Sequence, residues 1–150
     1  MSWTMTGLWA AATVLAAATA FGLLWRRRSG VLRAHRGSGD EVDGIIRPDD
    51  VGTELGEKAT LLQFSSAFCA PCRATRRVLG EVAGMVDGVA HVELDAESNL
   101  DLVRRLNVVR TPTVFVLDDA GRIVRRATGA PRKPDVIAAL GAAVGPRTEG

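Results

Sequence analysis

The sequence predicts an α/β domain, in which a central sheet carries helices on both faces, preceded by one transmembrane helix. An uncharged run from Gly7 to Trp25 lies near the N-terminus. After it, strand-like and helix-like segments alternate over about 105 residues, enough for one such domain. The chain holds two cysteines, Cys69 and Cys72, which are too few for a secreted scaffold stapled by disulfides. These observations favour a membrane-tethered α/β protein.

The uncharged run has the length and flanks of a membrane span. As a helix it would cover about 28 Å, close to the thickness of the bilayer's hydrocarbon core. Trp3, Trp9 and Trp25 lie near its two ends, where indole rings favour the membrane interface. We therefore expect residues 1–28 to form an N-terminal transmembrane anchor with a basic flank.

Two alternatives compete with an anchor. The segment Ala18–Ala20 resembles the small-residue site of a cleaved signal peptide, but no Lys or Arg precedes the run, and the run continues through Leu24. A buried core helix is the other alternative, and it is weaker because every face of the segment is apolar.

Charge predicts the orientation of the span. No Lys or Arg precedes it, whereas five arginines follow it: Arg26, Arg27, Arg28, Arg33 and Arg36. Positive residues beside a span prefer the cytoplasmic side, so the domain is expected in the cytoplasm, with an extracytoplasmic domain as the alternative. The arginines could also rest on anionic lipid headgroups, or act as a stop-transfer flank and nothing more.

Residues 29–44 are rich in Gly, Ser and charge without sustained periodicity, and are expected to form a flexible linker. His35 falls within this linker and is expected to be solvated. The domain is then expected over residues 45–145.

Within the domain, apolar runs and alternating residues predict strands, whereas apolar residues at helical spacing predict helices. The expected strands are residues 44–47, 59–66 and 88–95, and two strands within 112–128 joined by a turn at 118–121. The expected helices are residues 48–55, the segment from the cysteines to about 86, residues 99–108 and residues 133–144. This order implies a sheet covered on both faces.

The two cysteines follow a predicted strand at once and begin a predicted helix. Unpaired N–H groups and the helix dipole would favour a thiolate at Cys69 and lower its pKa, which creates a nucleophile for disulfide exchange. The two-residue spacing brings Cys72 close enough to resolve a mixed disulfide. Pro71 fits the first turn, where its missing N–H costs little.

A metal site and an incidental pair are the alternatives to a redox dithiol. A structural zinc site needs four ligands, and outside the cysteines only His35 and His91 offer nitrogens. Buried free cysteines are common in proteins, but C-x-x-C between a strand and a helix is a stronger redox signal. We expect no metal, and no cofactor other than the redox-active Cys69–Cys72 disulfide.

Two stretches resemble the thioredoxin family: Phe64 to Cys72, "FSSAFCAPC", and residues 108–130, "VVRTPTVFVLDDAGRIVRRATGA". They stand in the family's order and separation, and the similarity covers roughly Ile45 to Val144. The resemblance implies a thioredoxin-like fold.

The resemblance also implies roles for residues near the dithiol. Cys69 matches the attacking cysteine and Cys72 the resolving one. Thr111 and Pro112 match a cis-proline dipeptide that pairs with the substrate backbone, and Gly129 matches a glycine that keeps the substrate groove open. The other residues expected to contact substrate are Phe68, Ala70 and Pro71.

The chain departs from the family pattern at several positions. Gln63 stands where many members bury an aspartate, and His91 aligns with that aspartate's usual lysine partner. These two residues are a possible proton path, although His91 could equally be a structural strand histidine. Phe68 replaces a usual tryptophan and preserves an apolar lip. Arg77 replaces a helix-kinking proline, so a straighter helix is expected.

The sequence therefore predicts a thiol–disulfide oxidoreductase that reduces protein disulfides at the membrane. Its expected partners are a disulfide-containing protein substrate, an unidentified upstream electron donor and the lipid around the N-terminal helix, with no nucleic acid. The alternative is a non-catalytic thioredoxin-fold module that recruits a membrane partner. The presence of both cysteines argues against that alternative.

Overall fold

The computed structural model describes residues 2–28, 33–34 and 44–145. In this part of the chain, five strands form one mixed sheet in the order β1-β5-β4-β2-β3. The strands are β1 (Arg33–Ala34), β2 (Ala59–Ser65), β3 (Val89–Asp95), β4 (Thr113–Asp118) and β5 (Ile123–Thr128). The helices are α1 (Ser2–Arg28), α2 (Pro48–Val51), α3 (Ala70–Met85), α4 (Leu100–Arg105) and α5 (Lys133–Val144).

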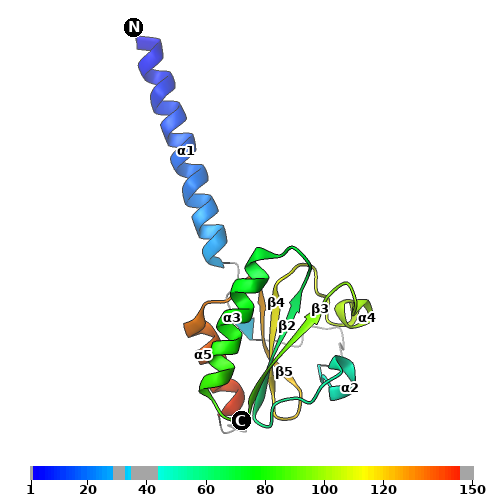
Figure 1. The fold of residues 1–150 in the computed structure, drawn as a ribbon. Helices are drawn as coiled ribbons and strands as arrows, with labels where there is room; N and C mark the ends of the chain where they lie inside the picture. The colour runs from blue at the N-terminus through cyan, green and yellow to red at the C-terminus, as the bar shows by residue number, and fades with distance from the viewer. Residues whose placement is uncertain (1, 29–32, 35–43, 146–150) are drawn as a thin grey trace.

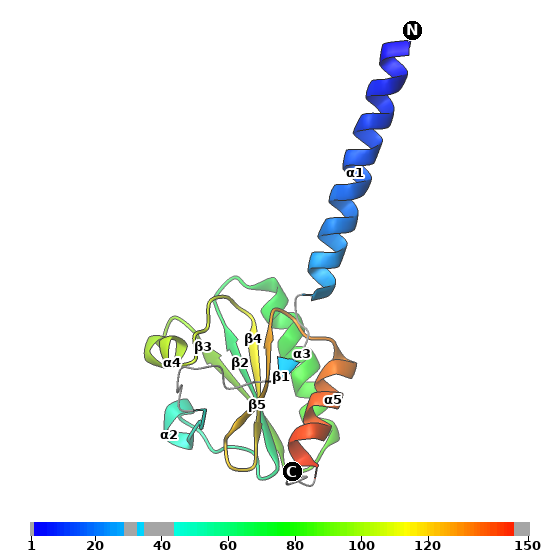
Figure 2. The same ribbon diagram turned by 180° about the vertical axis from the view of Figure 1, so that it is seen from behind.

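Helices cover both faces of the sheet, with α3 and α5 on one face and α2 and α4 on the other (Figures 1 and 2). The central strand β2 is parallel to β3 and antiparallel to β4, and all seven of its residues are buried. A strand buried on both faces is typical of a sheet enclosed by helices. The predicted fold class, a thioredoxin-like central mixed sheet with helices on both faces, is confirmed.

Successive residues of β2 point to opposite faces and enter two separate cores. Leu62 and Phe64 pack on the side of α2 and α4, where the ring of Phe64 meets that of Phe115 edge to face at 5.9 Å. Leu61 packs under α3 and α5. Gln63 and Ser65 lie on the α3 side as well, so two polar side chains are buried where β2 passes beneath the start of α3.

Two segments differ from the sequence prediction at the start of the domain. The strand expected at residues 44–47 is an isolated bridge between Ile45 and Arg122. The helix expected to reach residue 55 ends at Val51, because Gly52 adopts a left-handed conformation and its N–H bonds to the Pro48 carbonyl at 2.8 Å.

Within the segment expected to form a flexible linker, Arg33 and Ala34 form β1 and pair antiparallel with β5. An edge strand presents unpaired N–H and C=O groups that another segment can satisfy, which explains the pairing without any periodicity in the linker. Residues 29–32 and 35–43, and with them His35, lie outside the described residues.

Helix α1 stands apart from the domain (Figure 1). Within the described residues, Gly7–Trp25 is the one segment long and apolar enough to cross a membrane, and none of it is buried against the protein. Its large apolar side chains are exposed: Leu8, Trp9, Val14, Leu15, Phe21, Leu23, Leu24 and Trp25. This apolar surface is therefore largely exposed in the described structure.

The turn between β4 and β5 generates a test of the fold. Gly121 has φ of +77°, and a Cβ there would lie 2.1 Å from the backbone oxygen of Ile46. Gly121→Ala should therefore lower the free energy of unfolding by about 2 kcal/mol or more, measured by urea denaturation. Gly80→Ala, on an open position of α3, should instead stabilise by about 1 kcal/mol. Equal effects at the two glycines would contradict this turn geometry.

Candidate active site at the start of helix α3

A disulfide joins Cys69 and Cys72 at the beginning of α3. Cys69 is the N-cap residue of the helix, and Cys72 lies in its first turn together with Pro71. Cys72 is buried, with 2% of its surface exposed, whereas Cys69 is half-buried. Cys69 therefore carries the sulfur that another molecule can reach.

Hydrogen-bond donors surround the Cys69 sulfur. The backbone N–H of Cys72 donates to Cys69 Sγ at 3.2 Å. The Thr111 hydroxyl lies 3.9 Å from the same sulfur and is itself bonded to the hydroxyl of Ser66 at 2.9 Å. In the reduced protein, such donors at a helix N-terminus would stabilise a thiolate at Cys69.

Segments distant in sequence meet beside the disulfide. The Thr111–Pro112 peptide bond is cis, and the N–H of Gly129 donates to the Pro112 carbonyl at 2.7 Å. Thr111, Pro112 and Gly129 line one cavity together with Pro71. Four of the residues expected to contact substrate are thus gathered at one side of the dithiol, and their substrate role stays a prediction.

Phe68 projects from the loop before Cys69. Its side chain is fully exposed, and its backbone has φ of +58°, a conformation that bulky residues rarely adopt. Ala70 and Pro71 are exposed next to it. An exposed aromatic ring held in a strained backbone beside the disulfide suits contact with a partner better than contact with the core.

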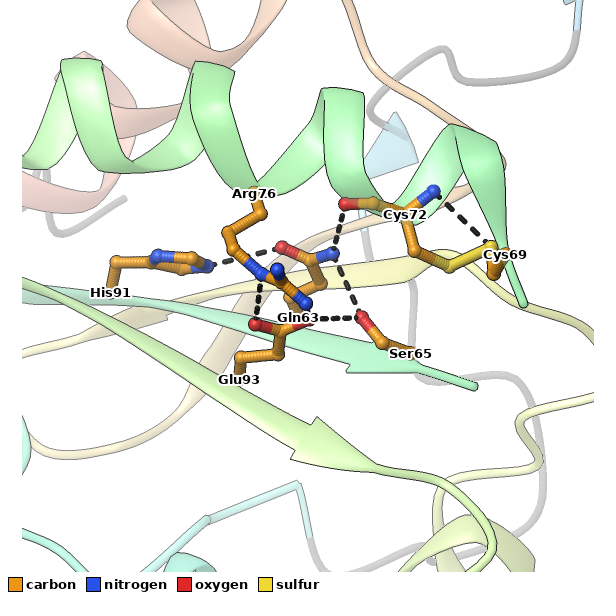
Figure 3. Close-up of polar contacts among 7 residues, drawn as sticks. All are labelled: Gln63, Ser65, Cys69, Cys72, Arg76, His91 and Glu93. Carbon is orange, nitrogen blue, oxygen red and sulfur yellow. Dashed lines mark hydrogen bonds and ion pairs between the residues drawn. A yellow bond between two sulfur atoms is a disulfide. The ribbon is translucent and has the colours of Figure 1, made fainter. Parts of the chain in front are cut away.

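A hydrogen-bonded network lies beneath the disulfide (Figure 3). The Gln63 side chain is completely buried, and its Nε2 donates to the backbone carbonyl of Cys72 and to Ser65 Oγ, both at 2.9 Å. Its Oε1 lies 3.1 Å from Nε2 of His91. The Ser65 hydroxyl donates to Glu93 Oε1 at 2.7 Å. Gln63 thus links β2, β3 and the first turn of α3.

The chemistry of these groups determines the direction of each bond. A carbonyl oxygen can only accept, so the Gln63 NH₂ group must face Cys72 and its Oε1 must face His91. Oε1 in turn can only accept, so His91 carries a proton on Nε2. Partial burial lowers the pKa of His91, with a smaller opposing effect of Glu93, and the ring is mostly neutral at neutral pH.

The network ends at an ion pair on the surface of β3. Arg76 of α3 donates from its Nη2 to Glu93 Oε1 at 2.8 Å and also binds the second carboxylate oxygen. Arg76 lowers the pKa of the Glu93 carboxyl, partial burial opposes this, and the Ser65 hydroxyl lowers the pKa further. Glu93 is therefore ionised at neutral pH.

The possible proton path through Gln63 and His91 stays a prediction, but the geometry favours a positioning role. The bonds from His91 and Gln63 lead to the backbone carbonyl of Cys72 and not to its sulfur. An amide also has no readily titrating proton to pass on. These bonds hold the start of α3 against the sheet.

Sequence reasoning missed four residues of the site: Ser65, Ser66, Arg76 and Glu93. A signal for two of them was present, because residues two apart in a strand share a face. Ser65 follows Gln63 in this way and Glu93 follows His91, and the parallel register pairs Gln63 with Glu93. Arg76 lies on helix α3, so the spacing of residues in the strands gives no signal for it. Among the described residues, no cluster of three or more His, Cys, Asp or Glu side chains could hold a metal ion.

Comparison with known proteins identifies the family of the chain. A family model described as thioredoxin matches residues 49–142. The chain belongs to the thioredoxin family. It is 30% identical over 108 residues to thioredoxin of Mycolicibacterium smegmatis, covering 69% of this chain and 96% of that protein. The predicted resemblance is confirmed.

Solved structures give the same result. Thioredoxin f from spinach chloroplast superposes with a TM-score of 0.52 at 27% identity, covering 59% of this chain and 78% of that one. A mutant thioredoxin from Halobacterium salinarum NRC-1 reaches a TM-score of 0.57 at 21% identity, covering 66% and 84%, and at that identity shows the fold alone. A thioredoxin domain with a Cys69–Cys72 pair at disulfide distance supports thiol–disulfide oxidoreductase chemistry.

The Glu93 ion pair generates a pH prediction. A carboxyl group whose pKa is lowered by folding contributes stability above its unfolded pKa, and that stability is lost as pH falls through the folded value. Between pH 5 and 3, measured by urea denaturation, Glu93→Gln should therefore lose less stability than the native chain. The difference should be small, because the Arg76 side chain is 54% exposed.

Arg76→Ala is the control for this prediction, because it removes the group that contributes most to the lowered pKa. Arg76→Ala should reduce the loss of stability between pH 5 and 3, and the double variant should reduce this loss no further. A native chain and a Glu93→Gln variant with parallel pH profiles would contradict the assigned ion pair.

The Phe68 backbone generates a second prediction. Because the ring touches little of the protein, Phe68→Gly should be more stable than Phe68→Ala by about 1 kcal/mol, since only glycine adopts positive φ without strain. Chemical denaturation of the oxidised variants measures this difference. Equal stability of the two variants would mean that Phe68 does not hold this conformation in solution.

Proposed function

We propose that this protein is a membrane-anchored thiol–disulfide oxidoreductase that reduces protein disulfides through Cys69 and Cys72. The observation that carries the proposal is the unequal environment of the two sulfurs. Cys69 is accessible at the helix N-cap and accepts the Cys72 N–H, whereas Cys72 is buried behind it. This arrangement supplies one nucleophile for the substrate and one protected thiol for the second step.

In the proposed reaction, the Cys69 thiolate attacks one sulfur of a substrate disulfide. The substrate S–S bond breaks, a mixed disulfide forms between Cys69 and the substrate, and the released substrate thiolate takes a proton from solvent. Cys72 then loses its proton and attacks Cys69 Sγ. The mixed disulfide breaks, the second substrate sulfur leaves as a thiolate that takes a proton from solvent, and the Cys69–Cys72 disulfide remains. Two electrons have passed to the substrate.

The disulfide form must then be reduced by an upstream dithiol donor, which transfers two electrons by the same exchange chemistry. The neutral amide of Gln63 leaves the site without a buried carboxylate directly below Cys72. The proton of Cys72 therefore leaves to solvent in this proposal, and the Gln63–His91 pair positions the helix start.

Anchoring is supported by the exposed apolar surface of α1. A helix that is apolar on all faces and is covered by no protein is stable in an apolar medium. The segment is long enough to cross a bilayer, and the tryptophans near its ends suit the interface. We place α1 in the membrane, where the lipid around the helix is the protein's membrane partner.

We place the domain on the cytoplasmic side, from the arginines that follow the span and the lack of any before it. In a reducing cytoplasm, catalysis would run toward substrate reduction. Protease added to intact spheroplasts should leave the domain uncut, and permeabilised cells should lose it. Cleavage in intact spheroplasts would place the domain outside.

The order of attack generates a trapping prediction. Cys72→Ser should accumulate mixed disulfides through Cys69, because the resolving thiol is absent, whereas Cys69→Ser should accumulate none, because Cys72 is buried. Non-reducing electrophoresis after acid quench, with and without a disulfide peptide substrate, measures both.

Equal trapping by the two variants would overturn the assigned order. Trapping by neither, together with no disulfide reduction by the native protein, would leave the fold as a binding module and contradict the enzymatic proposal. A double Cys69→Ser, Cys72→Ser variant is the baseline for both readouts.

A further inference from the structure

Strand β1 determines the end of the sheet at which the membrane helix leaves the domain. It pairs antiparallel with Arg125 and Arg126 of β5, so its first residue, Arg33, lies on the side of the end of β5 that continues into Gly129. The N–H of Gly129 donates to the Pro112 carbonyl, beside the disulfide. Helix α1 therefore leaves the domain at the end of the sheet that bears the dithiol (Figure 2).

Contacts at the start of the domain, after β1, are consistent with this direction of β1. The Ile123 N–H donates to the Gly44 carbonyl at 2.9 Å, and the Ile46 N–H donates to the Gly121 carbonyl at 2.8 Å. Both contacts lie at the turn between β4 and β5, opposite the disulfide. Gly44 and Ile46 therefore lie at the end of β5 that is opposite the disulfide.

The connection between helix and domain is short. Residues 29–32 alone separate the end of α1 at Arg28 from the start of β1 at Arg33. A fully extended chain from Arg28 to Arg33 reaches about 17 Å. With β1 paired to the sheet, the end of the span therefore stays within that distance of Arg33.

A cavity of about 650 Å³ lies between α1 and the dithiol end of the domain. Its lining includes Phe21 and Trp25 of α1, and Pro71, Thr111, Pro112 and Gly129 of the domain. The two aromatic residues belong to the last turns of the apolar segment, at the depth where aromatic rings favour the membrane interface. The cavity beside the disulfide therefore opens at the bilayer surface.

The exposed residues around the disulfide suit that location. Phe68 is fully exposed and Val109 is 74% exposed, so two large apolar side chains project from the loops at this end. Arg110 lines the same cavity and can face the anionic headgroup region. Apolar groups beside a cation match the chemistry of the interface better than that of bulk water.

Resting on the proposed function, we propose that this cavity receives disulfides of other membrane proteins, carried on segments that lie at the bilayer surface close to a membrane span. A soluble protein would have to approach through the space between domain and bilayer. A substrate anchored in the same membrane reaches the cavity from within the membrane plane, and its anchoring raises its effective concentration at Cys69.

The test uses the full-length, pre-reduced protein in lipid vesicles and single-turnover reduction of three synthetic peptides. Each peptide has the same two-cysteine disulfide ring. One carries the ring directly after a single transmembrane helix, one carries it on a Gly/Ser spacer of about 40 residues, and one is soluble. The ring beside the membrane should be reduced at least about tenfold faster than the ring on the long spacer.

Two insertions of equal length provide matched controls. A Gly/Ser insertion of about 20 residues after Gly30 lengthens the connection between α1 and β1 by about 25 Å, and should reduce the preference to within about twofold. The same insertion after Gly39 lies beyond β1, keeps the short connection, and should preserve the preference. Reduction of the soluble peptide should be the same in all three proteins.

The outcomes separate the two proposals. Equal rates for the near and far rings, or a preference that survives the insertion after Gly30, would overturn the membrane-substrate proposal while reduction of the soluble peptide upholds the oxidoreductase. Failure to reduce any peptide would overturn the proposed function itself, and this proposal with it.

Discussion

Gln63 places an uncharged amide, completely buried, where the central strand passes beneath the start of α3. Burying an amide without partners costs about 1–3 kcal/mol, and here both ends of the group are satisfied. Its NH₂ group holds the Cys72 carbonyl and Ser65, and its oxygen accepts from His91. The first turn of α3 is thereby attached to the middle of the sheet, and the position of both sulfurs depends on that attachment.

The neutral amide also changes the electrostatics of the site. The nearest ionised carboxylate in the network, Glu93, lies on the neighbouring strand and is neutralised by Arg76 at the surface. The charge that acts most directly on Cys69 is then the partial charge of the helix N-terminus, delivered through the Cys72 N–H. In the reduced protein, backbone groups would therefore favour a thiolate at Cys69, and these groups need no proton transfer of their own.

Much of the domain could be predicted because its elements have clear periods. The central strand, the helix after the cysteines, the hairpin and the last helix fall within a few residues of the expected bounds. The redox pair was predictable because C-x-x-C followed a strand and began a helix. The position of the pair between a strand and a helix follows from the order of elements along the chain, so predicting it does not require the tertiary arrangement.

The remaining features depend on contacts that a linear pattern does not contain. A two-residue strand has no periodicity, and Arg33 and Ala34 pair because β5 offers an open edge. The network from Ser65 through Glu93 to Arg76 joins three elements, so the sheet order must be known before it can be seen. The cavity against α1 depends likewise on where the tether leaves the sheet.

The central claim is that backbone donors at the start of α3 make Cys69 the nucleophile of the pair. The most direct measurement is the pH dependence of alkylation at each cysteine in the reduced full-length protein, with the modified sulfur identified by mass spectrometry. The account predicts that the pKa of Cys69 lies below that of a free cysteine, about 8.5, and that buried Cys72 reacts more slowly and titrates at higher pH. A Cys69 pKa at or above the free value, or faster alkylation of Cys72, would contradict it.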